Sequence, residues 1–282
     1  MEVILADVLG YCMGVRRAVD FVEKALETSS DKKVYTLGPL IHNKIALEKL
    51  QEKGLSVIQE NNINLLNQNT VVAIRAHGVS PDVIKSIENI GAMIVNATCP
   101  KVSASQKNAY KYAQMGYLVI LVGDKNHGEV TGIAGYAGDS FLLIESVSDA
   151  EKLQYLKQQK AVLLSQTTFN SDEFELIAEK LKPKFKELKI LNTICSATRE
   201  RQDALKRLCP LVEGVIVVGG KNSANSRRLF EIAKENCMKS VFIENVDEIP
   251  DYFYKLNKVG ITAGASTPDS VIKAVKEALE KY

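Results

Sequence analysis

The sequence predicts an α/β protein of three similar lobes, each with a mostly parallel sheet, arranged with pseudo-three-fold symmetry around a common centre. The first observation behind this fold class is an alternation along the whole chain. Short apolar runs such as 119–122 and 215–218 are separated by amphipathic stretches at helical spacing, and this is typical of parallel sheets covered on both faces. The second observation is an internal repeat, because one pattern of elements and polar residues occurs three times.

Each repeat is marked by a cysteine at the point where a strand is expected to end and a helix to begin. Cys12, Cys99 and Cys195 stand at these points, 87 and 96 residues apart. We therefore place the three lobes at residues 14–97, at 98–193, and at 194–282 together with 1–13. Residues 1–7 are expected to form a strand, and the sequence leaves open whether the third lobe borrows its last strand from the N-terminus or supplies one to it.

A helix and then a strand ending in glycine follow each cysteine, and a polar loop comes next. These loops carry His42, His127 and Ser223, which lie 30, 28 and 28 residues beyond their cysteines. Open parallel sheets bind ligands at the carboxyl ends of their strands. The polar side chains of these loops are therefore candidates for binding.

A further strand in each repeat leads to a second polar position. The residues at this position are His77, Thr167 and Ser266, which lie 65, 68 and 71 residues beyond the cysteines. A helix is expected soon after each of them, from positions 81, 171 and 268 onward. At the first and last of these starts, Ser or Thr followed by Pro is a capping signal. Three similar lobes are expected to direct all of these strand ends at one shared centre.

The composition excludes several classes of protein. With 282 residues, 46% of them apolar and 25% charged, the chain is ordinary for a globular protein. The net charge of +2 gives no basis for nucleic-acid binding, and no apolar run approaches the roughly 18–20 residues of a membrane span. The N-terminus lacks the basic region of a signal peptide. We therefore expect a cytoplasmic monomer that binds neither nucleic acid nor membrane, with its five cysteines reduced or bound to metal.

The three repeated cysteines predict a metal centre. A structural zinc would require four ligands, usually in close CxxC pairs, and the sequence has no CxxC. Three distant thiolates favour one [4Fe-4S] cluster per chain, with one iron left open for a substrate oxygen. A lone cysteine after a strand is more often a core residue, and it is the recurrence at equivalent places that favours ligands here. Cys209 and Cys237 lie outside the repeat and are expected to be core residues.

The polar loops predict an anion site. The candidate donors are His42, His77, Ser223, Asn225 and Ser266, all expected near helix N-termini, where backbone N–H groups and the helix dipole favour phosphate. A lone histidine is commonly structural. Capping of the last helix is the alternative to binding for Ser266 and Thr267. For Asn43 the alternative is a cap or a turn.

An acid stands among these polar residues. Glu129 follows His127 by two positions, and a carboxylic acid near a leaving hydroxyl can donate the proton that lets water depart. The hydroxyl of Thr167 could relay this proton. The alternative role for Glu129 is a first-turn helix acid that interacts with the dipole.

The residues at these positions resemble the motifs of the 4-hydroxy-3-methylbut-2-enyl diphosphate reductases, from the first strand to the last helix. The motifs, in chain order, are Gly10-Tyr11-Cys12-Met13-Gly14-Val15, Arg75-Ala76-His77-Gly78-Val79, Ala97-Thr98-Cys99-Pro100, His127-Gly128-Glu129-Val130, Ser165-Gln166-Thr167-Thr168, Thr193-Ile194-Cys195, Ser223-Ala224-Asn225-Ser226 and Thr262-Ala263-Gly264-Ala265-Ser266. The whole set in this order is highly specific.

The resemblance implies an iron–sulfur oxidoreductase that performs the last step of the methylerythritol phosphate route to isoprenoids. Two electrons and two protons would convert the allylic alcohol diphosphate into isopentenyl and dimethylallyl diphosphates and water, with a donor such as ferredoxin or flavodoxin. It implies a four-iron cluster on Cys12, Cys99 and Cys195, and three α/β lobes around that cluster. The implied diphosphate ligands are His42, His77, Ser223, Asn225 and Ser266. His127 and Thr167 match residues near the substrate, and Glu129 matches the proton donor.

Two residues depart from the family's pattern. Gly128 stands where proline is frequent, and we expect the glycine to loosen the loop that holds Glu129. Ala224 stands where a second serine is frequent, which removes one possible phosphate donor, worth about 1 kcal/mol of binding.

Three other functions are compatible with parts of the pattern. A dehydratase similar to quinolinate synthase would use three cysteines and a cluster without net electron input. A redox-sensing or iron-sensing protein would need an effector surface such as a basic DNA-reading helix, which the sequence does not contain. A sugar-phosphate binder with structural zinc would be colourless.

Overall fold

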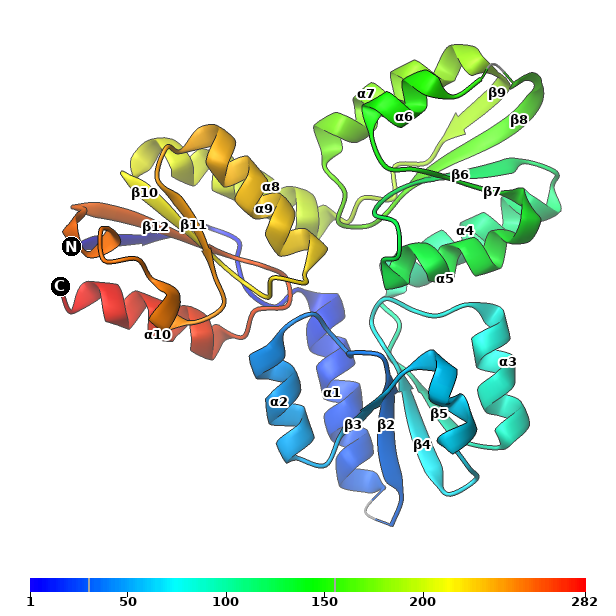
Figure 1. The fold of residues 1–282 in the computed structure, drawn as a ribbon, viewed down its shortest axis with the longest axis horizontal. Coiled ribbons are helices and arrows are strands. Elements are labelled where there is room, and N and C mark those ends of the chain that lie inside the picture. Colours follow the sequence, from blue (N-terminus) through cyan, green and yellow to red (C-terminus); the bar gives the residue numbers. More distant parts are fainter. Residues whose placement is uncertain (30, 155) are drawn as a thin grey trace. The chain divides into compact units, whose positions relative to one another are not determined.

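The computed structural model describes residues 1–29, 31–154 and 156–282, which form three four-stranded sheets (Figure 1). Every strand pair in these sheets is parallel. Helices connect successive strands, as parallel pairing requires. The predicted class of three parallel-sheet α/β lobes is therefore confirmed.

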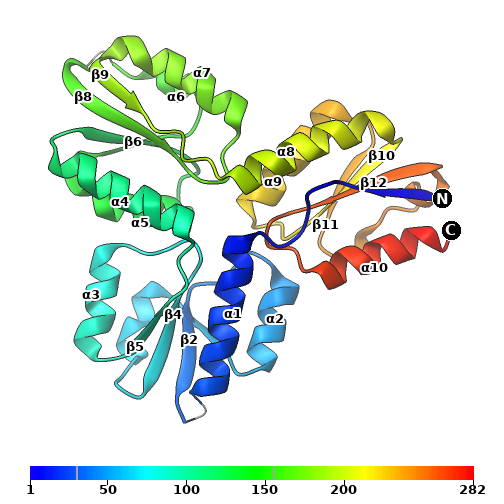
Figure 2. The same cartoon turned by 180° about the vertical axis from the view of Figure 1, so that it is seen from behind.

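Sheet B belongs to the N-terminal part of the chain. Its strands and the neighbouring helices, in chain order, are α1 (Met13–Thr28), β2 (Lys33–Leu37), α2 (Lys44–Glu52), β3 (Ser56–Ile58), the 3-10 turn η1 (Glu60–Leu65), β4 (Thr70–Ile74), α3 (Pro81–Ile90) and β5 (Met93–Asn96). The apolar face of α1, with Ala18, Val22 and Ala25, is buried, and Figure 2 shows this helix along the sheet.

Sheet C follows in the middle of the chain. Its elements are α4 (Pro100–Gln114), β6 (Leu118–Val122), α5 (Gly128–Ala137), η2 (Gly138–Ser140), β7 (Phe141–Ile144), α6 (Val147–Lys152), β8 (Leu156–Ser165), α7 (Ser171–Leu181), η3 (Lys182–Lys184) and β9 (Phe185–Ile190). The helix predicted from position 171 begins there, with the Asn170 side chain accepting the Glu173 N–H as its N-cap.

Sheet A combines the C-terminal part of the chain with the N-terminal strand. Its elements are β1 (Glu2–Leu5), α8 (Ser196–Leu208), η4 (Cys209–Leu211), β10 (Gly214–Val218), α9 (Ala224–Asn236), β11 (Ser240–Ile243), η5 (Val246–Glu248), η6 (Phe253–Lys255), β12 (Lys258–Ala263) and α10 (Asp269–Glu280).

The three sheets share one strand order. The orders are β3-β2-β4-β5, β7-β6-β8-β9 and β11-β10-β12-β1. The N-terminal strand β1 thus takes the place of a fourth strand and pairs with β12 in parallel, from Glu2 opposite Lys258 to Leu5 opposite Ile261. This settles the alternative that the sequence left open, because the third sheet receives its last strand from the N-terminus.

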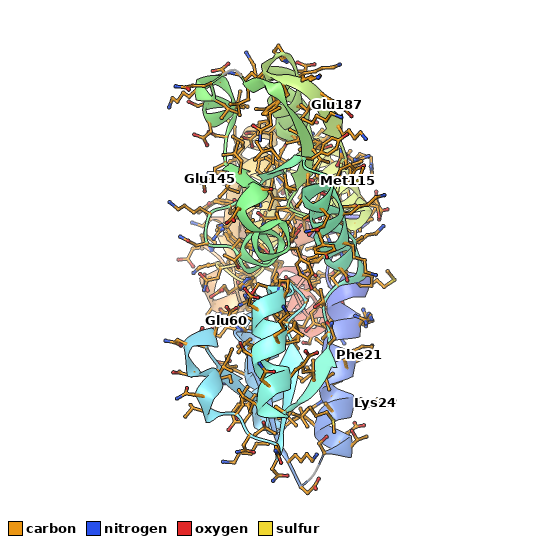
Figure 3. All side chains as sticks on the ribbon, turned by 90° about the vertical axis from the view of Figure 1, so that its right-hand side faces the viewer. Phe21, Lys24, Glu60, Met115, Glu145 and Glu187 are labelled. Carbon is orange, nitrogen blue, oxygen red and sulfur yellow. The ribbon has the colours of Figure 1, made fainter. Side chains whose placement is uncertain are left out.

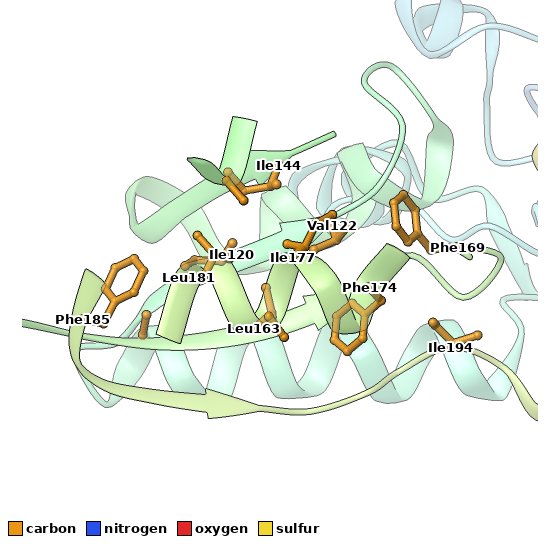
Figure 4. Packing of buried hydrophobic residues seen from close by; sticks show 13 residues of the cluster. Ile120, Val122, Ile144, Leu163, Phe169, Phe174, Ile177, Leu181, Phe185 and Ile194 are labelled. Carbon is orange, nitrogen blue, oxygen red and sulfur yellow. The ribbon is translucent and has the colours of Figure 1, made fainter. Parts of the chain in front are cut away.

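The central strands are buried on both faces, which explains their continuous apolar runs. In β6, Ile120 and Val122 pack on the side of α7, with Phe174 and Ile177 (Figure 4). Alternate residues of the same strand, Val119 and Leu121, pack with a second cluster that includes residues of α4 and α5. The period of two along a strand directs successive side chains to opposite faces. The strand β6 therefore contributes to a hydrophobic cluster on each face of its sheet.

The chain divides into two compact units. The first comprises Met1–Arg16, Ile41–Leu50 and Ser196–Tyr282 and contains sheet A, and the second comprises Arg17–Leu40 and Gln51–Cys195 and contains sheets B and C. Our lobe boundaries at 14–97, 98–193, and 194–282 with 1–13 follow the repeat and stay a proposal. Within the described ranges, no helix is both long enough and apolar enough to cross a membrane.

Candidate active site

The three repeated cysteines have equivalent surroundings in their lobes. Each immediately precedes a helix, α1, α4 or α8, and each is half-buried and outside any disulfide. Each cysteine follows the last strand of one sheet, and its backbone N–H donates to a carbonyl of the loop after the neighbouring strand of that sheet. These bonds are Cys12 to Ala265 at 3.1 Å, Cys99 to Ala76 at 2.9 Å and Cys195 to Thr167 at 2.9 Å. The structure therefore repeats the local setting of the cysteines as well as their spacing.

This setting suits thiolates. A helix N-terminus stabilises negative charge, and the Val15 N–H donates to Cys12 Sγ at 3.4 Å. Cys209 and Cys237 are instead buried in an apolar cluster, as expected. Burial, with a contribution from neighbouring Cys237, raises the pKa of Cys209 to about 11 and keeps this thiol neutral. The donor set that fits a thiolate-bound cluster is thus the repeated trio.

Two of the cysteine loops are each supported by an asparagine of their own. Asn96 and Asn192 each stand three residues before a cysteine, and their Oδ1 atoms accept the N–H of Thr98 at 3.0 Å and of Ile194 at 3.1 Å. Such asparagine turns fix the local backbone without secondary structure. The shared spacing from Asn to Cys is visible in the sequence and could have identified these residues, which the sequence analysis missed.

Two arginines also hold cysteine loops and were missed. Arg17 of α1 donates to the carbonyl of Thr98 at 2.9 Å, directly before Cys99. Arg201 of α8, only 3% exposed, donates to the carbonyls of Gly10 at 2.6 Å and Ala197 at 2.7 Å. The two arginines lie five and six residues beyond their own cysteines, which is the only signal that the sequence offers for them.

Glu129 connects to a cysteine loop through Thr167. Its carboxylate is 1% exposed and accepts the Thr167 backbone N–H at 2.6 Å and the Thr167 hydroxyl at 2.8 Å. The Thr167 carbonyl in turn accepts the Cys195 N–H. Glu129 does occupy the first turn of α5, but its carboxylate reaches across to another strand end. The geometry therefore places a buried acid, a hydroxyl and a cysteine loop in one connected chain.

Two of the predicted histidines lie together in the second unit. The rings of His77 and His127 meet edge to face, with centroids 5.2 Å apart and planes at 89°. His127 is the N-cap of α5, and its Nδ1 accepts the Glu129 N–H at 3.2 Å. A neutral His127 therefore carries its proton on Nε2.

The first unit holds the other polar candidates. Ser266 Oγ donates to the His42 carbonyl at 3.2 Å, and Ser223 caps α9 by accepting the Ser226 N–H at 3.3 Å. Asn225 is 4% exposed, and its Nδ2 has no hydrogen-bond acceptor among the residues that the structure describes. A buried amide donor of this kind requires an explanation, and an anionic ligand supplies one.

The capping alternatives are resolved residue by residue. Neither Ser266 nor Thr267 caps the last helix, because Thr267 Oγ1 donates to the Val218 carbonyl at 2.9 Å and the N-cap is Pro268. Asn43 does cap α2, since its Oδ1 accepts the Ala46 N–H at 2.9 Å. The helix predicted from position 268 thus begins one residue later.

The loop of Gly128 is packed against a distant side chain. The guanidinium of Arg75 lies against Gly128, so closely that a Cβ added at Gly128 would stand 2.9 Å from Arg75 Cζ. The space that a side chain would fill is occupied, and the loop is packed. Ala224 lies in the first turn of α9 and is buried.

Comparison with known proteins agrees with the motifs. A family model described as "LytB protein" matches residues 3–280. A 4-hydroxy-3-methylbut-2-enyl diphosphate reductase from Treponema denticola is 42% identical over 287 residues, covering 99% of both chains. One of the same name from Caldanaerobacter subterraneus subsp. tengcongensis is 41% identical over 281 residues, covering 99% of this chain and 97% of the relative.

Solved structures give the same result. The E-1-hydroxy-2-methyl-but-2-enyl-4-diphosphate reductase from Plasmodium falciparum matches with a TM-score of 0.92 and 30% identity, over 98% of this chain and 87% of that one. An (E)-4-hydroxy-3-methyl-but-2-enyl diphosphate reductase, described as the terminal enzyme of the non-mevalonate pathway, matches over the full length of both chains with a TM-score of 0.72 and 37% identity. The resemblance stated from the motifs is confirmed, and the chain belongs to the LytB protein family.

Proposed function

We propose that this protein reduces 4-hydroxy-3-methylbut-2-enyl diphosphate to isopentenyl and dimethylallyl diphosphates at one centre served by Cys12, Cys99 and Cys195. Full-length relatives that carry the name of this reductase support the reaction. The observation that carries the proposal is the equivalent setting of the three cysteines, each at a helix N-terminus, outside any disulfide and beside a loop with a polar residue.

The three cysteines would hold one [4Fe-4S] cluster per chain. A four-iron cluster normally takes four thiolates, so three leave one iron without a protein ligand. When bound, the cluster supplies electrons and an open iron position that acts as a Lewis acid. The half-buried thiols and their helix N-termini support this assignment, whereas the buried Cys209 does not suit a ligand.

We propose that the diphosphate binds His42, His77, Ser223, Asn225 and Ser266. Two features of the chain support an anion at these positions. Ser223 and Asn225 stand at the first turn of α9, where free backbone N–H groups favour phosphate. The buried Nδ2 of Asn225 also lacks an acceptor among the described residues, and a phosphate oxygen would satisfy it.

Glu129, Thr167 and His127 would manage the proton. The reaction breaks the C–O bond of the allylic alcohol and consumes two electrons and two protons. One proton leaves with the hydroxyl as water and the other ends on the carbon skeleton. The buried Glu129 carboxyl is hydrogen bonded to the Thr167 hydroxyl, so a proton held by Glu129 can pass through that hydroxyl to the departing oxygen.

We further propose a cytoplasmic monomer that takes electrons from a small donor such as ferredoxin or flavodoxin. All five cysteines lie outside any disulfide, which suits a reducing compartment. The net charge of +2 leaves both nucleic acid and membrane outside the proposed partners.

Anaerobic purification followed by iron and sulfide analysis, beside an assay of the hydroxylated diphosphate with reduced methyl viologen, tests the proposal. We expect about four irons per chain and conversion to both five-carbon diphosphates only when the reductant is present. Turnover without reductant would favour the dehydratase instead. A colourless protein that cannot be reconstituted with iron and sulfide would overturn the cluster assignment.

A further inference from the structure

Arg75 occupies an unusual position directly after β4, two residues before His77. Its side chain is 14% exposed. Nε donates to the carbonyl of Gly78 at 3.3 Å, and Nη2 donates to Oε1 of Glu60 at 3.1 Å. Glu60, labelled in Figure 3, opens the turn η1 and is itself partly exposed. Burial lowers the pKa of Arg75 and Glu60 opposes this effect, so the guanidinium stays charged at neutral pH.

Two glycine backbones enclose the guanidinium. A Cβ added at Gly38, which follows β2, would lie 2.5 Å from Nη1. A Cβ added at Gly128, the first residue of α5, would lie 2.9 Å from both Cζ and Nη2. The guanidinium therefore contacts the loop after β2, the loop after β4 and the start of α5 at the same time. The loop after β2 leads to His42, and the loop after β4 carries His77. The start of α5 follows His127 and carries Glu129.

The backbone at position 128 does not itself require glycine. Gly128 has no left-handed φ, and it stands at the first helical position, where proline is favoured because the N–H has no partner in the helix. The preceding His127 has φ −74° and ψ 136°, the extended conformation that proline demands of the residue before it. The Arg75 guanidinium, held by its bonds to Gly78 and Glu60, would have to shift to admit a larger residue here.

We propose that Arg75 is a positioning residue that fixes the His77 loop against the His127–Glu129 loop, with its guanidinium packed against Gly128. The contact at Gly128 sets where α5 begins, and the beginning of α5 sets the His127 cap and the Glu129 carboxylate. This inference rests on the proposed function, since it concerns the placement of the proposed proton donor.

A double-mutant cycle tests the contact. Gly128→Pro alone is expected to lower kcat about 10-fold or more, because the ring and the guanidinium need the same space, and Arg75→Ser alone is expected to lower kcat by a similar factor. In the Arg75→Ser background the proline has room at a position that favours it. We therefore expect Gly128→Pro to cause no further loss there, which is a coupling of about 10-fold.

A second glycine of α5 provides the matched control. Gly135 faces Ser80, whose Cβ and Cα lie in close contact with its backbone, and Arg75 is not among its neighbours. Gly135→Ala is therefore expected to reduce kcat by the same factor with Arg75 or with Ser at position 75. If Gly128→Pro does not fold, Gly128→Ala replaces it in the cycle with a smaller expected loss.

The readouts separate positioning from general stability. For Arg75→Ser we expect kcat to fall while KM, iron content and the visible spectrum of the cluster stay near wild type. Additive losses at positions 75 and 128 would overturn the inference, as would a fall in iron content and Tm that matches the fall in kcat. A wild-type protein that holds iron but does not convert the diphosphate would overturn the proposed function as well. Conversion by wild type with an additive cycle would overturn the role of Arg75 alone.

Discussion

The carboxylate of Glu129 is almost completely removed from solvent and meets two donors of one residue, Thr167. Burying a carboxyl group is costly unless hydrogen bonds compensate it. Here the compensation comes from a strand end that also holds the Cys195 loop. At the scale of single residues, the proposed acid and the proposed cluster ligand are therefore placed by the same threonine.

Replacing this acid separates proton delivery from binding. Glu129→Gln keeps the size of the side chain but has no acidic proton. The amide carbonyl can replace only in part the carboxylate that accepts two hydrogen bonds from Thr167. We expect iron content and substrate binding to persist while kcat falls about 10²–10⁴-fold, measured with reduced methyl viologen. Glu175→Gln, an exposed acid of α7, is the control and should leave kcat unchanged. Turnover of Glu129→Gln near wild type would show that another group supplies the proton.

The cysteines provide a comparison within one chain. Cys99→Ser removes a proposed ligand from a half-buried helix N-terminus, and we expect loss of iron, colour and turnover, because two thiolates anchor a cluster poorly. Cys209→Ala removes a buried thiol outside the repeat, and we expect full iron content after anaerobic reconstitution. A fully loaded and active Cys99→Ser protein would contradict the ligand assignment.

At the scale of elements, five of the functional positions lie directly before a helix. The helices α1, α4 and α8 follow the cysteines, α5 follows His127 and α9 follows Ser223. The predicted helix starts at 81 and 171 are confirmed, although Ser80 makes no side-chain capping bond and α7 is capped by Asn170. The sequence analysis missed Arg17 and Arg201, because their acceptors lie 81 and 191 residues away in the chain, and no local pattern specifies such a pair.

Arg201 is expected to link the stability of α8 to the Cys12 loop. Arg201→Met leaves the Gly10 carbonyl without its buried donor, and an unsatisfied acceptor costs about 1–3 kcal/mol. We expect a lower free energy of unfolding in denaturant and faster loss of iron on exposure to air. Arg199→Met, at an exposed position of the same helix, is the control. Equal stability and iron retention in the two variants would show that the Arg201 bonds do not hold the loop.

At the scale of the whole molecule, three copies of one strand order produce three sheets with polar residues at corresponding strand ends. Stability of the first unit also depends on groups far from these ends. Cys209 lies in the apolar cluster between sheet A and the helices α8 and α9, so its protonation contributes to global unfolding.

The raised pKa of Cys209 predicts a specific loss of stability in alkali. The folded protein holds this proton up to about pH 11, while the ordinary value is 9.0. Its contribution is therefore complete below pH 9, where both states are protonated, and is lost as the pH rises to about 11. The loss is at most about 3 kcal/mol. Denaturant unfolding of wild type and Cys209→Ala across this pH range should show a shallower decline for the variant, and parallel curves would contradict the prediction.

The sequence by itself determined the features that depend on local spacing. Apolar periodicity defined the α/β class, the threefold repeat identified the cysteines and polar loop residues, and the ordered motifs indicated the family. These signals are strong because burial on both faces of a strand and the chemistry of a helix start act over a few neighbouring residues.

Only the tertiary structure decided which distant segments meet. It placed β1 beside β12, brought the Glu129 carboxylate to Thr167 and set Arg75 against Gly128. The side chain that fills the space beside Gly128 lies 53 residues earlier, so no local pattern in the sequence indicated this contact. Such contacts arise when whole sheets and helices pack, since the gain comes from burial and shape complementarity between elements that share no local pattern.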